Sequence, residues 1–179
     1  MKDIILTGPK HSGKTSTGKA LASICICEFI DLDELVSQRT GKTPRQLYIE
    51  SPAVFQKAEA DAITAFAQEL CSASGENVQW RVIAAGGGII DNPEAIAVLK
   101  SLNATIVFLD AYADTAWKRI NNSADGFLPP GFGINNPQET HRELHEKRSD
   151  AYQQLADIVI FIEGKTPQEI AGEILELIE

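Results

Sequence analysis

The stretch that decides the fold is GPKHSGKT, Gly8–Thr15, which follows the short apolar run DIILT, Asp3–Thr7. It matches the pattern G-x-x-x-x-G-K-[ST] at every fixed position. The residues after it, Lys14–Ile24, have the composition of a helix. A buried strand that ends in glycine and leads into a helix is the setting in which this pattern forms a phosphate-binding loop, or P-loop. The stretch therefore predicts a strand, loop and helix that together bind a nucleotide.

The residue types within the loop suit phosphate binding. Backbone N–H groups between Gly8 and Thr15 can surround a phosphate, and the positive end of the following helix points toward it. Lys14 can place a positive charge on the β- and γ-phosphate oxygens, and the Thr15 hydroxyl can bind Mg²⁺. We therefore expect Lys14 to be catalytic and Thr15 to be a metal ligand. The expected nucleotide contacts from the loop are Gly8, Lys10, Ser12, Gly13, Lys14, Thr15 and Ser16.

Strand and helix patterns alternate along the rest of the chain, which is typical of an α/β fold with a parallel sheet. We predict a single domain over residues 1–179, with three layers (α/β/α) around a five-stranded, mostly parallel sheet. The predicted strands are Asp3–Gly8, Cys27–Asp33, Arg81–Ile90, Ala104–Ala111 and Asp157–Glu163. The predicted helices are Lys14–Ile24, Ser51–Leu70, Asn92–Leu102, Pro137–Ala156 and Thr166–Glu179.

Polar and glycine residues follow several of these strands. Because ligands of such folds bind at the carboxyl ends of the strands, we expect Gly8, Asp31, Asp33, Gly86–Gly88 and Asp110 to converge on one crevice. The stretch from Asn121 to Pro137 is rich in Gly, Pro and Asn and is too long for an ordinary connection. It is interpreted as a lid loop, with a disordered insertion as the alternative.

The composition of the chain excludes some classes of binding partner. The net charge of −9 repels nucleic acid and anionic membranes at long range, so neither is an expected partner. The three cysteines, Cys25, Cys27 and Cys71, fit no zinc or disulfide framework and favour a reducing, cytoplasmic location. No apolar stretch approaches the ~20 residues of a membrane helix. We expect a monomer that acts on a small-molecule substrate.

The same features narrow the class of P-loop protein. A GTPase would carry an N-K-x-D guanine motif, which the sequence lacks, and a motor ATPase would need a longer chain. A small single domain fits a nucleoside or metabolite kinase, which positions ATP and Mg²⁺ and stabilises charge during phosphoryl transfer.

Four motifs together point to one family. They are GPKHSGKT, FIDLDEL (Phe29–Leu35), AAGGGII (Ala84–Ile90) and RSDAYQQLAD (Arg148–Asp157). In order and spacing, over nearly the whole chain, the sequence resembles the shikimate kinase family. The resemblance implies a P-loop fold like that of the nucleoside monophosphate kinases, and phosphorylation of shikimate by ATP with Mg²⁺.

The resemblance also implies roles for single residues. Asp31 would lie near Mg²⁺, and Asp33 would bind shikimate hydroxyls and act as the base. Gly86, Gly87 and Gly88 would lie against the substrate ring, and Arg148 would pair with its carboxylate. Arg119 would pack on adenine, with Lys165 and Thr166 on the opposite wall. The alternatives are helix capping for the aspartates, a tight turn for the glycines, and solvated surface charges for the arginines.

Two positions depart from the family pattern. Gln56 stands where the family has an arginine that helps to bind the substrate carboxylate, and no Lys or Arg occurs from Asn121 to His141, where the family lid has an arginine. Gln56 can still donate a hydrogen bond to the substrate, but without charge. Three explanations remain open: a shikimate kinase that replaces these arginines with others, such as Lys10, Arg45 or Arg142; a kinase for another hydroxylated metabolite; or a nucleotide-binding regulatory protein with weakened catalysis.

Overall fold

The computed structural model describes residues 2–72, 80–122 and 136–178. Its centre is a five-stranded sheet in the order β2-β3-β1-β4-β5, in which every pair of neighbours is parallel. The strands are β1 (Asp3–Thr7), β2 (Glu28–Asp31), β3 (Arg81–Ala84), β4 (Ala104–Asp110) and β5 (Ile158–Phe161). The predicted α/β fold with a five-stranded parallel sheet is confirmed.

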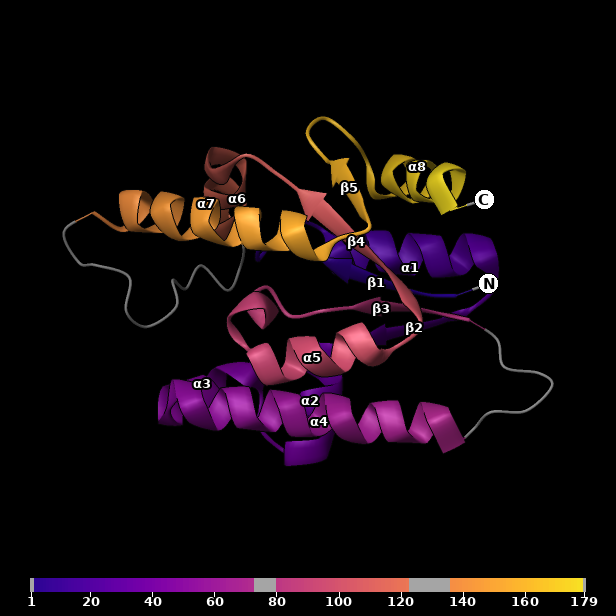
Figure 1. Ribbon diagram of the computed structural model, residues 1–179. Coiled ribbons are helices and arrows are strands. Elements are labelled where there is room, and N and C mark those ends of the chain that lie inside the picture. Colours follow the sequence, from indigo (N-terminus) through magenta and orange to yellow (C-terminus); the bar gives the residue numbers. More distant parts are fainter. Residues whose placement is uncertain (1, 73–79, 123–135, 179) are drawn as a thin grey trace.

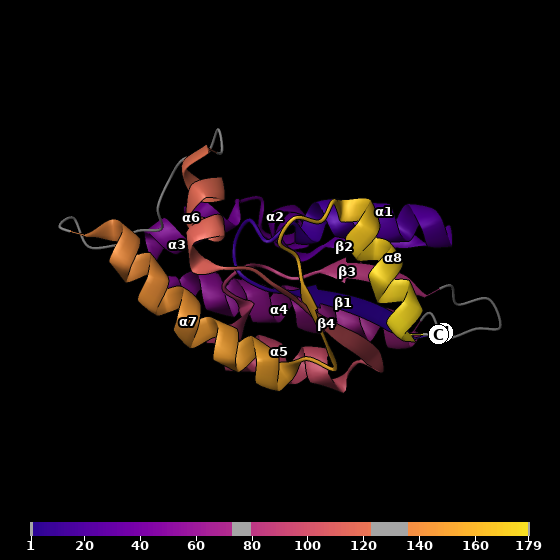
Figure 2. The same ribbon diagram turned by 90° about the horizontal axis from the view of Figure 1, so that it is seen from above.

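Helices cover both faces of this sheet. On one face lie α1 (Lys14–Cys25) and α8 (Pro167–Ile178), and on the other lie α4 (Pro52–Ser72), α5 (Pro93–Ser101) and α7 (Pro137–Leu155) (Figures 1 and 2). Successive residues of β1 separate the two cores: Ile4 and Leu6 pack under α1 and α8, whereas Ile5 faces α4 and α5. Since burial on both faces requires apolar residues throughout, this explains the continuous run IIL in β1.

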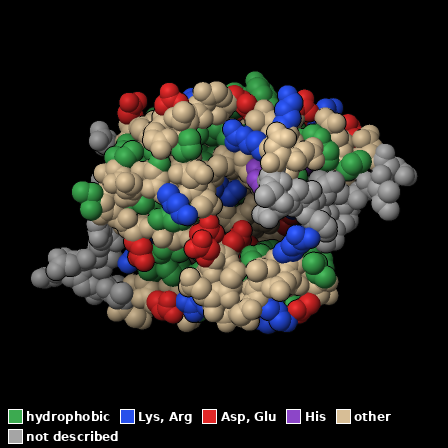
Figure 3. All heavy atoms as spheres, turned by 180° about the vertical axis from the view of Figure 1, so that it is seen from behind, with side chains coloured by type: hydrophobic (Ala, Val, Ile, Leu, Met, Phe, Trp, Pro, Cys, Tyr) green, Lys and Arg blue, Asp and Glu red, His purple; other side chains and the backbone are tan. Residues whose placement is uncertain are grey.

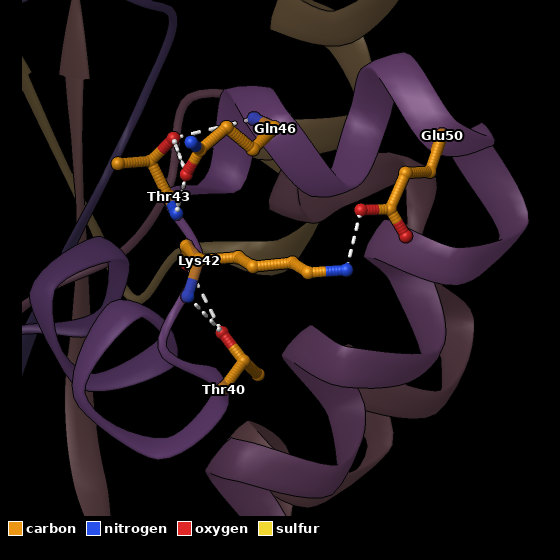
Figure 4. Close-up of polar contacts among 5 residues, drawn as sticks. All are labelled: Thr40, Lys42, Thr43, Gln46 and Glu50. Atoms are coloured by element: carbon orange, nitrogen blue, oxygen red, sulfur yellow. Dashed lines mark hydrogen bonds and ion pairs between the residues drawn. The ribbon is translucent and has the colours of Figure 1, made fainter.

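Two short helices pack against α4 beside this sandwich: α2 (Leu32–Thr40) and α3 (Pro44–Glu50). A capping box begins α3, because Thr43 Oγ1 accepts from the N–H of Gln46 and Gln46 Oε1 accepts from the N–H of Thr43 (Figure 4). The ammonium of Lys42, just before α3, pairs at 2.6 Å with Glu50, the last residue of that helix (Figure 4).

The structure differs from the sequence-based prediction at several elements. The predicted helices include none of α2, α3 and α6 (Ala113–Asn122), and the strand predicted over Cys27–Asp33 ends at Asp31, directly before α2 begins. The strand predicted to reach Ile90 ends at Ala84, and a 3₁₀ helix, η1, forms over Ile89–Asp91. The predicted lid, about 121–137, falls mainly on residues 123–135, which lie outside the described residues. Within the described ranges, no helix is long and apolar enough to cross a membrane.

Candidate active site

One face of the molecule is hollowed, and basic and acidic side chains meet around the hollow (Figure 3). A pocket of about 550 Å³ lies at the carboxyl ends of β1, β2 and β3. Of the predicted nucleotide-binding residues, the pocket is lined by Lys10, Ser12, Gly13, Lys14, Thr15, Ser16, Arg119 and Lys165. Asp31, Asp33 and Gly87 also line it. Of the residues predicted to converge at the ends of the strands, Asp31, Asp33 and Gly87 therefore line this pocket, whereas Gly8, Gly86, Gly88 and Asp110 do not.

The P-loop backbone takes conformations that need glycine. Gly8 has a φ of +138°, and a Cβ there would lie 2.7 Å from the carbonyl oxygen of Leu109. Gly13, with a φ of +91°, directly precedes α1. Both are backbone positions that a residue with a side chain rarely adopts. The loop is thereby wrapped over the first turn of α1, with the N–H groups of that turn directed into the pocket.

Lys14 is held inside the loop. Only 8% of Lys14 is exposed, and its ammonium donates to the carbonyl oxygens of Gly8 at 2.9 Å and Pro9 at 2.8 Å. Burial lowers the pKa of Lys14 to about 8, although the carboxylates of Asp33 and Asp31 act in the opposite direction. A buried ammonium held by neutral carbonyls is poorly compensated, so an anionic phosphate is a better partner than those carbonyls.

Asp31 has two partners in the structure. Its Oδ2 accepts from the Thr15 hydroxyl at 2.9 Å, and its Oδ1 accepts from the N–H of Asp33 at 3.0 Å and so caps α2. The capping alternative is thus correct for Asp31, but the same carboxylate also reaches the loop. A hydroxyl and a carboxylate oxygen at hydrogen-bond distance are hard ligands of the kind that Mg²⁺ prefers.

Asp33 turns its carboxylate toward the glycine triplet. A Cβ on Gly86 would lie 2.8 Å from Asp33 Oδ1 and 3.2 Å from Glu59 Oε1, so both carboxylates lie beside this glycine. Burial is the main cause that raises the pKa of Asp33, with a further contribution from Asp31, whereas Lys14 and Lys10 lower it. Asp33 is therefore a carboxylate in a low-dielectric setting, the environment that makes such a group a stronger base.

Glu59 is the residue that the sequence analysis misses. It lies on α4, is 2% exposed, and its Oε2 accepts from Asn92 Nδ2 at 2.8 Å. The pKa of Glu59 is raised to about 7, mainly by burial and to a lesser extent by the charges of Asp33 and Asp91, while the hydrogen bond from Asn92 opposes this shift. The sequence did carry a signal for Glu59, because it follows Phe55 by four residues and so lies on the apolar face of a long helix. A charged residue is rarely buried on such a face unless it has a partner.

The glycine triplet joins the two halves of the crevice. A Cβ on Gly87 would lie 2.7 Å from the backbone nitrogen of Lys10 and 2.9 Å from its Cα. The tight-turn alternative is correct in part, because the N–H of Ile89 donates to the carbonyl oxygen of Gly86 at 3.1 Å, but none of the three glycines has a positive φ, so the turn itself does not require glycine. Glycine is needed here for space, because the turn after β3 packs directly on the P-loop backbone.

Gln56 and Arg148 meet at one corner of the site but are not among the residues that line the pocket. Both contact Asp91. Gln56 Nε2 donates to the main-chain oxygen of Asp91 at 3.0 Å, and Arg148 pairs with the Asp91 carboxylate.

Two other cations lie near this corner in the sequence or the fold. Lys57, adjacent to Gln56, pairs with Asp61 on the exposed side of α4, and Arg142 pairs with Asp114 and Glu139. Neither cation lines the pocket, whereas Lys10, another candidate to replace the missing arginine, does.

Of the residues predicted to surround adenine, two line the pocket and one does not. Arg119 Nη1 donates to the carbonyl of His11 at 3.1 Å and Lys165 pairs with Glu173, and both line the pocket. Thr166 instead begins α8, where its N–H and hydroxyl donate to Glu169 Oε2. Its place in the pocket wall is taken by Pro167 and Ile170.

Comparison with known proteins identifies the family to which this chain belongs. The family model described as shikimate kinase matches residues 10–179, which include the P-loop lysine, both aspartates and the glycine triplet. The chain belongs to the shikimate kinase family. It is 31% identical over 176 residues to the shikimate kinase of Caldanaerobacter subterraneus subsp. tengcongensis, with 98% of this chain and 95% of that protein covered. It is 34% identical to the shikimate kinase of Lactococcus lactis subsp. cremoris, with coverage of 97% and 96%.

A solved structure agrees with these relatives. The shikimate kinase from Acinetobacter baumannii, determined in complex with shikimate, superposes with a TM-score of 0.83 at 25% identity, over 99% of this chain and 93% of that one. This shikimate kinase family member is accordingly an ATP-dependent small-molecule kinase. The departure at Gln56 lies within a fold that is otherwise that of the family.

The close approach of Gly87 to the P-loop yields a test. We predict that Gly87→Ala weakens ADP binding by about tenfold or more, because the added methyl must displace the backbone of Lys10. Gly172→Ala is the matched control, since a Cβ there meets nothing within 4 Å and lies in a helix. Isothermal titration calorimetry with ADP measures both. Equal affinity in the two variants would contradict the predicted contact.

The buried carboxyl of Glu59 gives a second test. Its folded-state pKa of about 7 lies above the ordinary 4.5, so its contribution to stability is full below pH 4.5 and is lost as the pH rises through 7. The loss is at most about 3 kcal/mol. We predict that Glu59→Gln flattens the decline in the free energy of unfolding between about pH 5 and pH 8, measured by urea denaturation. Asp61→Asn, exposed on the same helix, should keep the decline; an unchanged slope in Glu59→Gln would refute the assignment.

Proposed function

We propose that this kinase transfers the γ-phosphoryl group of ATP to a hydroxyl of shikimate, with Mg²⁺ bound at Thr15 and Asp31. The observation that carries the proposal is that Lys14 and Asp33 line the same pocket, one from the P-loop and the other from the first turn of α2, directly after β2. Such a pair puts a cation for phosphate oxygens and a base for a hydroxyl on either side of one reacting group.

The donor half of the pocket fits a nucleotide phosphate and its metal. The N–H groups of the first turn of α1 and the Lys14 ammonium would bind the phosphate oxygens, and Thr15 and Asp31 would hold Mg²⁺ directly or through water. Bound Mg²⁺ would neutralise charge on the phosphate oxygens during transfer. Arg119 and Lys165 line the part of the pocket that would take the base of the nucleotide.

The acceptor half fits a hydroxylated ring. Asp33 would accept the hydroxyl proton while the hydroxyl oxygen forms its bond to the γ-phosphorus and the bond to the β-phosphate oxygen breaks. Burial, the main reason for its raised pKa, favours this proton transfer. Gly86 and Gly87, which offer backbone and no side chain, would let a flat ring approach the triplet closely. Glu59, two per cent exposed, would close the floor behind Asp33.

A second candidate function rests on a specific observation. Gln56 supplies no charge and Arg148 is already paired with Asp91, so the acceptor corner offers less positive charge than a carboxylate ligand favours. A hydroxylated acceptor without a carboxylate is therefore the alternative substrate class, and a regulatory protein that binds ATP without turnover is the weaker one. We further propose that the enzyme works as a cytoplasmic monomer.

The assay that separates these functions is ADP release with Mg-ATP across a panel of cyclic polyols and hydroxy acids that includes shikimate. We predict turnover with shikimate. Lys14→Ala should lower kcat by at least about 100-fold, because it removes the buried ammonium from the phosphate site. Lys19→Ala, exposed on the same helix, is the control and should retain activity. Turnover only with acceptors that lack a carboxylate would favour the second function, and ATP binding without any turnover would favour the regulatory one.

A further inference from the structure

Arg148 is engaged by a carboxylate of its own chain. Its Nε and Nη2 both donate to Asp91 Oδ2, at 3.0 and 2.5 Å. Arg148 comes from α7 and Asp91 from the last position of η1, 57 residues earlier in the chain. The side chains are 24% and 44% exposed, so the pair is partly screened by solvent but not fully so. Arg148 thereby has an anionic partner before any ligand arrives.

The position of Asp91 is fixed by neighbouring side chains. Gln56 donates to its main-chain oxygen, and Asn92, which follows it, is 3% exposed and donates to the main-chain oxygen of Gln56 and to Glu59. These bonds tie η1 to α4. The carboxylate therefore lies beside Arg148 because the backbone beneath it is held there, which distinguishes this pair from one between two mobile surface side chains.

This pair belongs to the acceptor corner of the site. A Cβ on Gly88 would lie 3.6 Å from Arg148 Nη2, so the guanidinium packs beside the same triplet whose Gly86 meets Asp33 and Glu59. Asp91 is also near enough to Glu59 to raise its pKa. Three carboxyl groups, from Asp33, Glu59 and Asp91, thus lie near the glycine triplet, and Asp91 is the one that pairs with the guanidinium of Arg148. Among the described residues, Asp91 is the hydrogen-bond partner of Arg148, and both of these bonds leave Nη1 unused.

We propose that Asp91 is a specificity-determining residue: an internal counter-charge that weakens the hold of Arg148 on the carboxylate of the acceptor and lets the site accept neutral analogues nearly as well. The proposal rests on the proposed function, since it assumes that the acceptor lies beside Gly86–Gly88. An incoming carboxylate must either share Arg148 with Asp91 through Nη1 or displace Asp91, and it does so beside two other acidic groups. Each route lowers affinity for a charged acceptor and leaves a neutral one unaffected.

The test compares Asp91→Asn with the native enzyme on shikimate and on its uncharged methyl ester. Asparagine keeps an acceptor oxygen for Arg148 and removes only the charge. We expect KM for shikimate to fall about tenfold, which corresponds to about 1.4 kcal/mol, with kcat nearly unchanged and with KM for the methyl ester unchanged. Glu69→Gln is the matched control, because it neutralises the carboxylate of another arginine pair, Arg39–Glu69, outside the site and changes the net charge equally.

Each other outcome overturns the inference. A rise in the KM for shikimate in Asp91→Asn would mean that Asp91 positions Arg148 and does not compete for it. Equal changes for both acceptors would mean a structural role, which thermal unfolding of the variant would also register. If the native enzyme turns over shikimate but Asp91→Asn lacks the selective gain, only this inference fails. If neither the native enzyme nor the variant turns over shikimate, the proposed function fails, and this inference fails with it.

Discussion

The crevice depends on one close contact, between the turn after β3 and the backbone of the P-loop. Gly87 approaches the Lys10 nitrogen so closely that a Cβ would lie 2.7 Å away, and the N–H of Ala85 still donates to Leu6 of β1 at 2.9 Å. Because the turn and the loop touch, the phosphate end and the acceptor end form one pocket. A side chain at this point would have to displace the P-loop backbone at Lys10.

The pocket then works through carboxyl and ammonium groups that the fold keeps from water. Lys14, Asp33 and Glu59 all have pKa values moved by burial, Lys14 downward and the two carboxyls upward. Burial makes the charged form of each group less favourable unless the group has a partner of opposite charge or a hydrogen-bond partner. It therefore favours the binding of a ligand that provides such a partner. The donor half of the pocket has cationic side chains that can bind an anion, whereas the acceptor half is rich in carboxylates. This asymmetry suits a phosphate donor on one side and a polyhydroxylated acceptor on the other.

Sequence patterns correctly predicted the features that depend on the backbone geometry of a few neighbouring residues. The P-loop, the aspartates that follow β2 and the glycine triplet are each defined within a few residues, and the alternation of apolar strands and helices predicted the parallel sheet. The α3 helix was not predictable in this way, because seven residues are too few to show a helical period. The partner of Arg148 lies 57 residues away, and only the packing of α7 against η1 brings them together. Glu59 was missed because a glutamate within a helix is usually exposed.

In this family member the P-loop residues line one side of the pocket, the acceptor corner has little net positive charge, and we propose that the reaction is phosphorylation of a shikimate hydroxyl. The most direct measurement is ³¹P nuclear magnetic resonance of the enzyme with Mg-ATP and shikimate. The account predicts a new phosphomonoester signal, split into a doublet by the single proton on the esterified carbon, that grows in step with ADP. Consumption of ATP to inorganic phosphate alone, or no change in the ATP signals, would contradict it.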